Sequence, residues 1–404
     1  MKKHFILLFL IFFVSTNAQV WEDNLLNNNP NAGITEKADA FDNYRAKVEY
    51  TKGNGYKPYA RNLDFILQRT SDGKGIPNGK FYTEWLKEKK RFDQHKSTSN
   101  SNWTELGPIN TPIILSNGKK RGNGRINCIA FDPFDKEKIW VGSPGGGLWS
   151  SPDGGNTWST NTDGLPVIGV SYIAINPIDP QEMYITTGDA HASDTYSIGI
   201  LKSNDGGQTW DTTGMQFAIT DDKMVNKVII HPTFTDSLFA VTDNNIKISP
   251  DGGQTWSNAL STSGSVLSGY FRDIEFKPNN PDVLYAVKQT TGSSQVYKSS
   301  DRGQTWAVAM NGISTVNRNR PLLAVTPANP DAVYVLFCMN DYGFHGIYKS
   351  TDNADSWTLQ SDSPNILGRN TDGTSTGGQS WYDLSLGVST EDEDLLYVGG
   401  INLW

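Results

Sequence analysis

Hydrophobic residues recur along most of this chain in short groups, and each group ends at a turn residue. One kind of group is aliphatic and runs into a polar residue followed by proline, as 126–131 do before Asp132 and 172–175 do before Asn176. A second apolar group follows several residues later, and a third, shorter one precedes a polar turn. Short apolar groups bounded by turn residues are typical of β-strands, so the pattern predicts an all-β fold.

One eight-residue phrase, SPDGGNTW at 151–158, follows the third strand of every unit. It returns at 203–210, 249–256 and 299–306, and in a form without glycine at 350–357. The acidic residues of the five copies are Asp153, Asp205, Asp251, Asp301 and Asp352, and the closing residues are Trp158, Trp210, Trp256, Trp306 and Trp357. A period of about 50 residues with four short antiparallel strands per unit predicts a β-propeller of four-stranded blades.

The repeated phrase has the chemistry of a tight turn between the third and fourth strands. Its Asp can accept hydrogen bonds from the amides of the turn, and the Ser and Thr hydroxyls can bond across the hairpin. Glycine at the fifth position suits a left-handed backbone, and the Trp can pack between neighbouring sheets. Because five copies cannot each be an active site, we expect a structural role for all of them.

The repeat divides the chain into a preface and a propeller. Residues 19–102 lack the repeat, and apolar positions at helical spacing within 35–50, 61–69 and 81–92 predict a mostly helical N-terminal region with a linker. The propeller is expected over 103–404, as five whole blades and part of a sixth. Since the sixth unit stops after its second strand, we expect the propeller to be incomplete at its C-terminus and the natural product to be longer.

The first residues have the pattern of a secretory signal. Two lysines precede an apolar run at 5–14, and small residues before the cut place cleavage after Ala18. The run is too short to span a bilayer, and no later stretch resembles a membrane helix. We therefore expect a protein that is secreted or held at the cell surface, with residues 1–18 removed.

Charge and ligand-type residues exclude several functions. The net charge is −8, with 35 basic and 43 acidic residues, so a clustered basic surface for nucleic acid is not expected. The five histidines and two cysteines show no spacing of metal-ligand type, and we expect no metal and no cofactor. Cys128 and Cys338 lie in different units, so we predict buried free thiols rather than a disulfide.

The repeated phrase resembles the Asp-box, also called the BNR repeat, and the resemblance covers about 103–404. Asp-boxes occur in sialidases, in the xyloglucan-cleaving glycoside hydrolase family 74 and in sortilin-type propellers. The stretches GILKSNDGG at 199–207 and GIYKSTD at 346–352 look most like the sortilin-type N-terminal domain. The signal sequence and helical preface are similar to those of bacterial secreted members.

The resemblance also gives expectations about catalysis. A sialidase would need an Arg-Ile-Pro motif and an arginine triad, but the motif is absent and the candidates are unevenly placed; they are Arg125, Arg272, Arg318 and Arg320. A family 74 enzyme carries its first catalytic Asp in a Thr-Asp-x-Gly-Gly loop, and here Pro144 stands at that position. The other carboxylate of that family comes from a second propeller.

Candidate ligand residues lie in the loops that the strand order puts on the face opposite the Asp-boxes. The long loop 187–197 is either a polar binding loop over the channel mouth or a solvated loop whose acids cap its own turns. A second long loop spans 338–345, and aromatic and acidic residues enter the sixth blade. The candidates are Asp189, His191, Asp194, Tyr196, Asp341, His345, Trp381 and Asp383.

Taken together, the sequence predicts a sortilin-like propeller that binds a glycan or a protein on the face opposite the Asp-boxes and has no catalytic set of its own. The alternative is a family 74-like glycoside hydrolase that uses Asp189 or Asp383 in place of the lost acid. A third interpretation is a structural segment of a large adhesin.

Overall fold

The structure is a computed structural model that describes residues 32–47, 56–67, 83–88, 124–192 and 195–404, with residues 25, 29 and 90. The chain divides into two compact units, Met1–Ser99 and Asn100–Trp404. In the first unit, α2 (Ile34–Arg45) packs against α3 (Tyr56–Leu67), and residues 83–88 are also helical. No helix in the described ranges is both long and apolar enough to cross a membrane. The signal sequence predicted at 1–18 lies outside these ranges.

The second unit is a β-propeller of Asp-box blades, in which the four strands of each blade pair in chain order. The strands of blade 1 are β1 (Cys128–Phe131), β2 (Ile139–Ser143), β3 (Gly147–Ser151) and β4 (Ser159–Thr160). Those of blade 2 are β5 (Val170–Ile175), β6 (Met183–Thr187), β7 (Gly199–Ser203) and β8 (Asp211–Gln216), followed by the short 3-10 helix η1 (Ile219–Asp221). Those of blade 3 are β9 (Val225–Ile230), β10 (Leu238–Thr242), β11 (Ile246–Ser249) and β12 (Ser257–Asn258).

The remaining sheets follow the same plan with two differences. The strands of blade 4 are β14 (Tyr270–Phe276), β15 (Leu284–Gln289), β16 (Gln295–Ser299) and β17 (Thr305–Val308). The additional strand β13 (Leu260–Ser261) pairs with β17 in parallel. Those of blade 5 are β18 (Pro321–Thr326), β19 (Asn329–Cys338), β20 (Phe344–Ser350) and β21 (Thr358–Ser361). The sixth sheet has two strands, β22 (Ser385–Val388) and β23 (Leu396–Gly399).

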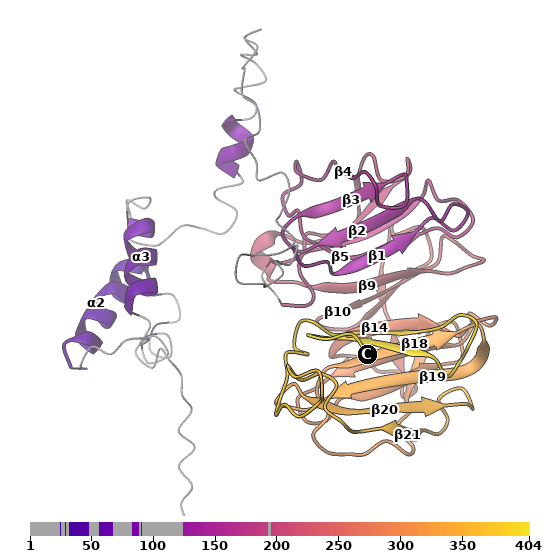
Figure 1. The fold of residues 1–404 in the computed structure, drawn as a ribbon. Helices are drawn as coiled ribbons and strands as arrows, with labels where there is room; N and C mark the ends of the chain where they lie inside the picture. Colours follow the sequence, from indigo (N-terminus) through magenta and orange to yellow (C-terminus); the bar gives the residue numbers. More distant parts are fainter. Residues whose placement is uncertain are drawn as a thin grey trace, which may run out of the picture. The chain divides into compact units, whose positions relative to one another are not determined.

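The inner strands of consecutive blades lie against one another, β1 with β5, β5 with β9, β9 with β14, β14 with β18 and β18 with β22. Figure 1 shows these strands toward the middle of the unit and β4 and β21 at its outside. Five apolar clusters lie between successive sheets, and each takes residues from two neighbouring blades. The blades are therefore held by sheet-on-sheet packing, as expected for stacked repeats that cannot bury an apolar face alone.

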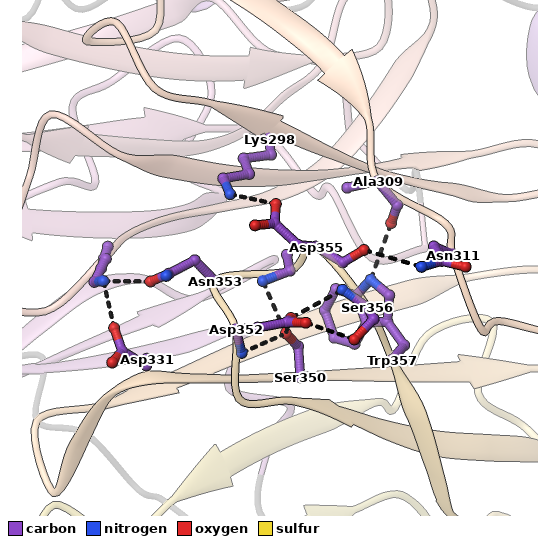
Figure 2. Close-up of polar contacts among 12 residues, drawn as sticks. Lys298, Ala309, Asn311, Asp331, Ser350, Asp352, Asn353, Asp355, Ser356 and Trp357 are labelled. Carbon is purple, nitrogen blue, oxygen red and sulfur yellow. Dashed lines mark hydrogen bonds and ion pairs between the residues drawn. The ribbon is translucent and has the colours of Figure 1, made fainter.

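The Asp-box turns share one hydrogen-bond pattern, which Figure 2 shows for the fifth copy. The Ser350 hydroxyl donates to Asp352 Oδ1 at 2.7 Å and accepts from the Ala354 amide at 2.8 Å. The Ser356 amide donates to Asp352 Oδ1 at 2.8 Å, and its hydroxyl donates to Oδ2. Equivalent bonds join the Ser, the Asp and the residue before the Trp in the other four copies.

The fourth and fifth positions of the turn both adopt a left-handed backbone. In the first copy these are Gly154 (φ 66°) and Gly155 (φ 89°), and in the fifth they are Asn353 (φ 61°) and Ala354 (φ 66°). Left-handed backbone costs a residue with a Cβ about 1–2 kcal/mol, so the fifth turn keeps its shape at some strain. Its hydrogen bonds and the Asn353 contact with Lys277 offset that strain.

The expectation that every closing Trp packs between sheets is wrong for the first copy. Trp306 and Trp357 are buried, whereas Trp158 is 41% exposed. Each later Trp packs toward the preceding blade; the ring of Trp357, for example, donates to the carbonyl of Ala309, which follows β17. Among the described residues no sheet precedes blade 1, so Trp158 has no such surface and instead donates to its own Gly155.

Candidate functional site at the channel mouth

The strand order places the start of each inner strand and the loops between second and third strands on one face, opposite the Asp-box turns. On this face a cavity of about 270 Å³ is lined by the inner strands and by residues of the β6–β7 loop. The inner strands are therefore not apolar throughout at this end. Asn127, Asn226, Arg272 and Glu275 interrupt the apolar runs and face the cavity.

Asp189 follows β6 and is fully buried. Its carboxylate accepts hydrogen bonds from Arg125 and from the amides of His191 at 3.1 Å and Ala192 at 3.3 Å. Burial acts to raise the pKa of Asp189, but these amides and the Arg125 charge together lower it. The residue thus caps its own turn, as one alternative predicted, but it is buried rather than solvated as that alternative expected, and its bond to Arg125 ties blade 2 to the segment before β1.

Two further arginines surround His191. Arg320 Nη2 donates to His191 Nδ1 at 2.6 Å, and its Nη1 donates to the Trp381 carbonyl. Arg272 donates from Nε to Gln289 Oε1 at 2.6 Å and from Nη1 to the Ala190 carbonyl. Burial, followed by the charges of Arg320 and Arg272, lowers the pKa of His191 to about 3. The imidazole is therefore neutral at physiological pH.

An ion cluster lines the same cavity. Lys227 Nζ donates to Asp273 Oδ1 at 2.8 Å and to Glu275 Oε1 at 2.6 Å, and it lies 5.0 Å from the ring centre of Tyr172. Burial would lower the pKa of Lys227, but the two carboxylates raise it well above its ordinary value. Burial raises the pKa of Glu275 against the attraction of Lys227.

Asp383 enters the sixth sheet on the same face. Burial raises its pKa, although the charge of Arg320 acts in the opposite direction. Its Oδ1 is buried and has no hydrogen-bond partner. Beside it, the Trp381 side chain is 43% exposed, and its ring lies 4.3 Å from that of Tyr382. The segment therefore combines a carboxyl group that resists ionisation with an exposed aromatic surface.

Among the predicted residues that the structure describes, His191 alone lines the cavity. Asp341 Oδ1 accepts from the Gly343 amide at 3.1 Å, which is a turn contact of the β19–β20 loop. His345 lies on β20, and its Nε2 is 3.0 Å from the Val316 carbonyl. Tyr196 is 38% exposed. Asp194 lies outside the described residues.

Sequence reasoning named the arginines but did not bring them together, and it missed the Lys227 cluster. Arg125, Arg272 and Arg320 were considered too unevenly spaced to act together, yet the fold brings all three around residues 189–191. The available signal was their position, because each stands at or just before the start of an inner strand. Charged residues at these positions interrupt runs that are otherwise apolar.

The remaining candidates for chemistry are metal-ligand groups and the two cysteines. Over the described ranges no three His, Cys, Asp or Glu residues are grouped so as to hold a metal ion. Cys128 and Cys338 are free, and Cys338 is buried as predicted. Cys128, on β1, is partly exposed over the whole residue, but its thiol is buried, and this burial raises the pKa of the thiol to about 12.

Comparison with known proteins gives three findings. A sortilin–Vps10 family model, described as sortilin, neurotensin receptor 3, matches residues 244–371. A xyloglucanase from a Paenibacillus species is 25% identical over 317 residues, which cover 70% of this chain and 30% of the relative. A xyloglucanase from Acetivibrio thermocellus is 27% identical over 219 residues, which cover 46% of this chain and 25% of the relative. The chain thus spans about a third or less of the curated relatives it matches.

Solved structures agree on the fold. An ancestral glycoside hydrolase family 74 enzyme superposes with a TM-score of 0.52 at 16% identity, covering 69% of this chain and 35% of that one. A family 74 xyloglucanase from Xanthomonas campestris superposes with a TM-score of 0.50 at 15% identity, and the superposition covers 69% of this chain and 42% of that one. The chain is an Asp-box propeller with distant similarity to family 74.

These relatives contradict the prediction of a binding or scaffold module without catalysis. The curated relatives are named as xyloglucanases, which are glycoside hydrolases, and none of those given above is a binding module. The error came from Pro144, whose place in the loop suggested that the catalytic acid was lost. The findings favour the alternative, a glycoside hydrolase with its acid elsewhere.

Proposed function

We propose that this chain is the propeller of a secreted glycoside hydrolase that cleaves a polysaccharide of the xyloglucan type. The observation that carries the proposal is the similarity to a xyloglucanase over 317 residues, 70% of the chain. The glycan would bind on the face opposite the Asp-boxes, at the channel mouth. Export would follow from the N-terminal signal sequence, with cleavage after Ala18.

Glycoside hydrolysis needs a carboxylic acid that protonates the leaving oxygen and a second carboxylate. Asp383 suits the role of acid, because burial raises its pKa and its Oδ1 has no competing hydrogen bond. Asp189 does not suit it, because Arg125 and two amides hold it ionised. Glu275 lines the cavity with one bond to Lys227, and we assign it the role of the second carboxylate.

The aromatic surface beside Asp383 fits a sugar ring. Trp381 exposes 43% of its surface and is oriented by its contact with the Tyr382 ring. Carbohydrate sites combine such apolar faces with a few polar groups that fix orientation. In this proposal Trp381 carries the sugar next to the bond that Asp383 protonates.

The proposal is tested by incubating the purified chain with xyloglucan, mixed-linkage glucan and mannan and measuring new reducing ends. We expect release from xyloglucan that exceeds release from mannan at least tenfold. A folded chain, as judged by circular dichroism, that releases no reducing ends from any of the three would contradict the proposed function.

A further inference from the structure

Among the described residues, neither Arg272 nor Arg320 forms an ion pair with a carboxylate within 4.0 Å. The partners of Arg320 are the His191 imidazole and a carbonyl, and those of Arg272 are an amide oxygen and a carbonyl. Arg320 is only 2% exposed, and its Nε has no hydrogen-bond partner. A buried charge without a counter-charge is costly, so the pair provides a strong attraction for an anion.

The nearby carboxylates are already committed or too distant. Asp189 is paired with Arg125, and both Asp273 and Glu275 are bonded to Lys227. Asp383 acts on Arg320 electrostatically, but in the described part of the chain it makes no ion pair within 4.0 Å. Burial, together with the repulsion between the two guanidiniums, lowers the pKa of Arg320 to about 9, which leaves it protonated at neutral pH.

His191 supplies a third donor. Arg320 Nη2 can only donate, so His191 Nδ1 must accept, and the ring proton of the neutral imidazole is then on Nε2. Ala190 and His191 line the cavity together with both arginines. Two cations and a neutral histidine therefore border one small cavity.

The rest of the lining is mixed: it holds the ion cluster of Lys227, Asp273 and Glu275, three leucines, and polar residues that include Asn127 and Asn226. The amide nitrogens of Asn127 and Asn226 donate to the Val170 and Phe271 carbonyls, and their Oδ1 atoms accept no hydrogen bond. These oxygens can accept from hydroxyl groups, which a simple anion lacks. A cavity of about 270 Å³ has room for a single sugar ring rather than for a chain of rings.

We infer that the channel mouth is a subsite for a sugar acid, whose carboxylate binds between Arg272 and Arg320 with His191 Nε2 as a further donor. The inference rests on the proposed function, since it takes the ligand to be a glycan. It adds that the natural polysaccharide carries uronate groups. Guanidinium groups bind carboxylates through paired, charge-assisted hydrogen bonds, so the subsite discriminates between acidic and neutral sugars.

The test is calorimetric titration of the full chain with D-glucuronate, D-glucose, acetate and sulfate. We expect D-glucuronate to bind at least tenfold more tightly than each of the others. Arg272→Gln should weaken glucuronate binding at least tenfold, and Arg272→Lys should lie between it and the parent. Arg302→Gln is the matched control, because Arg302 pairs with Asp282 on the opposite face.

Three binding results would overturn the inference. Equal affinity for glucuronate and glucose would show that the arginines do not bind the carboxylate. Equal affinity for glucuronate and for acetate or sulfate would show that the cavity binds anions in general. An Arg272→Gln variant that has the same melting temperature as the parent and binds glucuronate equally well would show that Arg272 does not bind the ligand. Hydrolysis of neutral xyloglucan is measured separately, so glucuronate binding without hydrolysis would refute only the proposed function.

Discussion

Replacing Asp383 with Asn is expected to lower kcat/KM for xyloglucan by about 10²–10⁴-fold, the usual contribution of a general acid. The amide cannot deliver a proton to the leaving oxygen, yet it has nearly the same size as the carboxyl group. Because burial raises the pKa of Asp383, the acid stays protonated to higher pH than an exposed Asp does. Activity of the parent should fall as pH rises through that pKa, and the variant should lose this dependence.

Asp282→Asn is the matched control for this experiment. Asp282 pairs with Arg302 at 2.6 Å at the Asp-box end of blade 4 and is exposed, so its loss should leave kcat/KM unchanged. An Asp383→Asn variant with the parent's kcat/KM and pH profile would exclude Asp383 as the acid. A proportional loss in both variants would point to a general effect on the fold.

Asp189→Ala is expected to lower the free energy of unfolding by about 3 kcal/mol. The substitution removes the carboxylate that pairs with Arg125 and the acceptor of two amides in a buried loop. Breaking a buried ion pair from one side costs about 3–5 kcal/mol, and the Arg125 side chain, 24% exposed, recovers part of its hydration. Urea unfolding measured by tryptophan fluorescence gives the value.

The contribution of Asp189 should depend on pH. Its pKa is lowered in the folded state, so its stabilising effect is present above the unfolded pKa of about 3.9 and is lost as pH falls through the folded value. The stability difference between the parent and Asp189→Asn should therefore shrink below about pH 4. A difference that stays constant from pH 7 to pH 3 would show that the Asp189 charge does not stabilise the fold.

The propeller could be predicted from sequence because its signal is local. The bonds of each Asp-box turn join residues two to four positions apart, so the turn depends on the phrase itself. Repetition at a nearly constant spacing then fixes the blades and the face on which the turns lie. The exposure of Trp158 was missed because it depends on a neighbouring sheet, which the phrase does not encode.

The site was predicted only in part, because its contacts join distant residues. His191 and Arg320 are 129 positions apart, and Arg125 and Asp189 are 64 apart. Loop length and polarity drew attention to Asp189 and His191, but no local pattern states which side chains from other blades meet them. The roles of Arg272 and Arg320 become visible only when the inner strands of different blades are arranged around one channel.

The most direct test of the account is hydrogen–deuterium exchange of the full chain with and without a xyloglucan oligosaccharide. The account places the ligand at the channel mouth, so backbone amides at 187–192 and 381–386 should exchange more slowly when the oligosaccharide is bound. Amides of the Asp-box turns at 151–158 and 249–256 should be unchanged. Slower exchange in those turns, with no change at the channel mouth, would contradict the assignment of function to the face opposite the Asp-boxes.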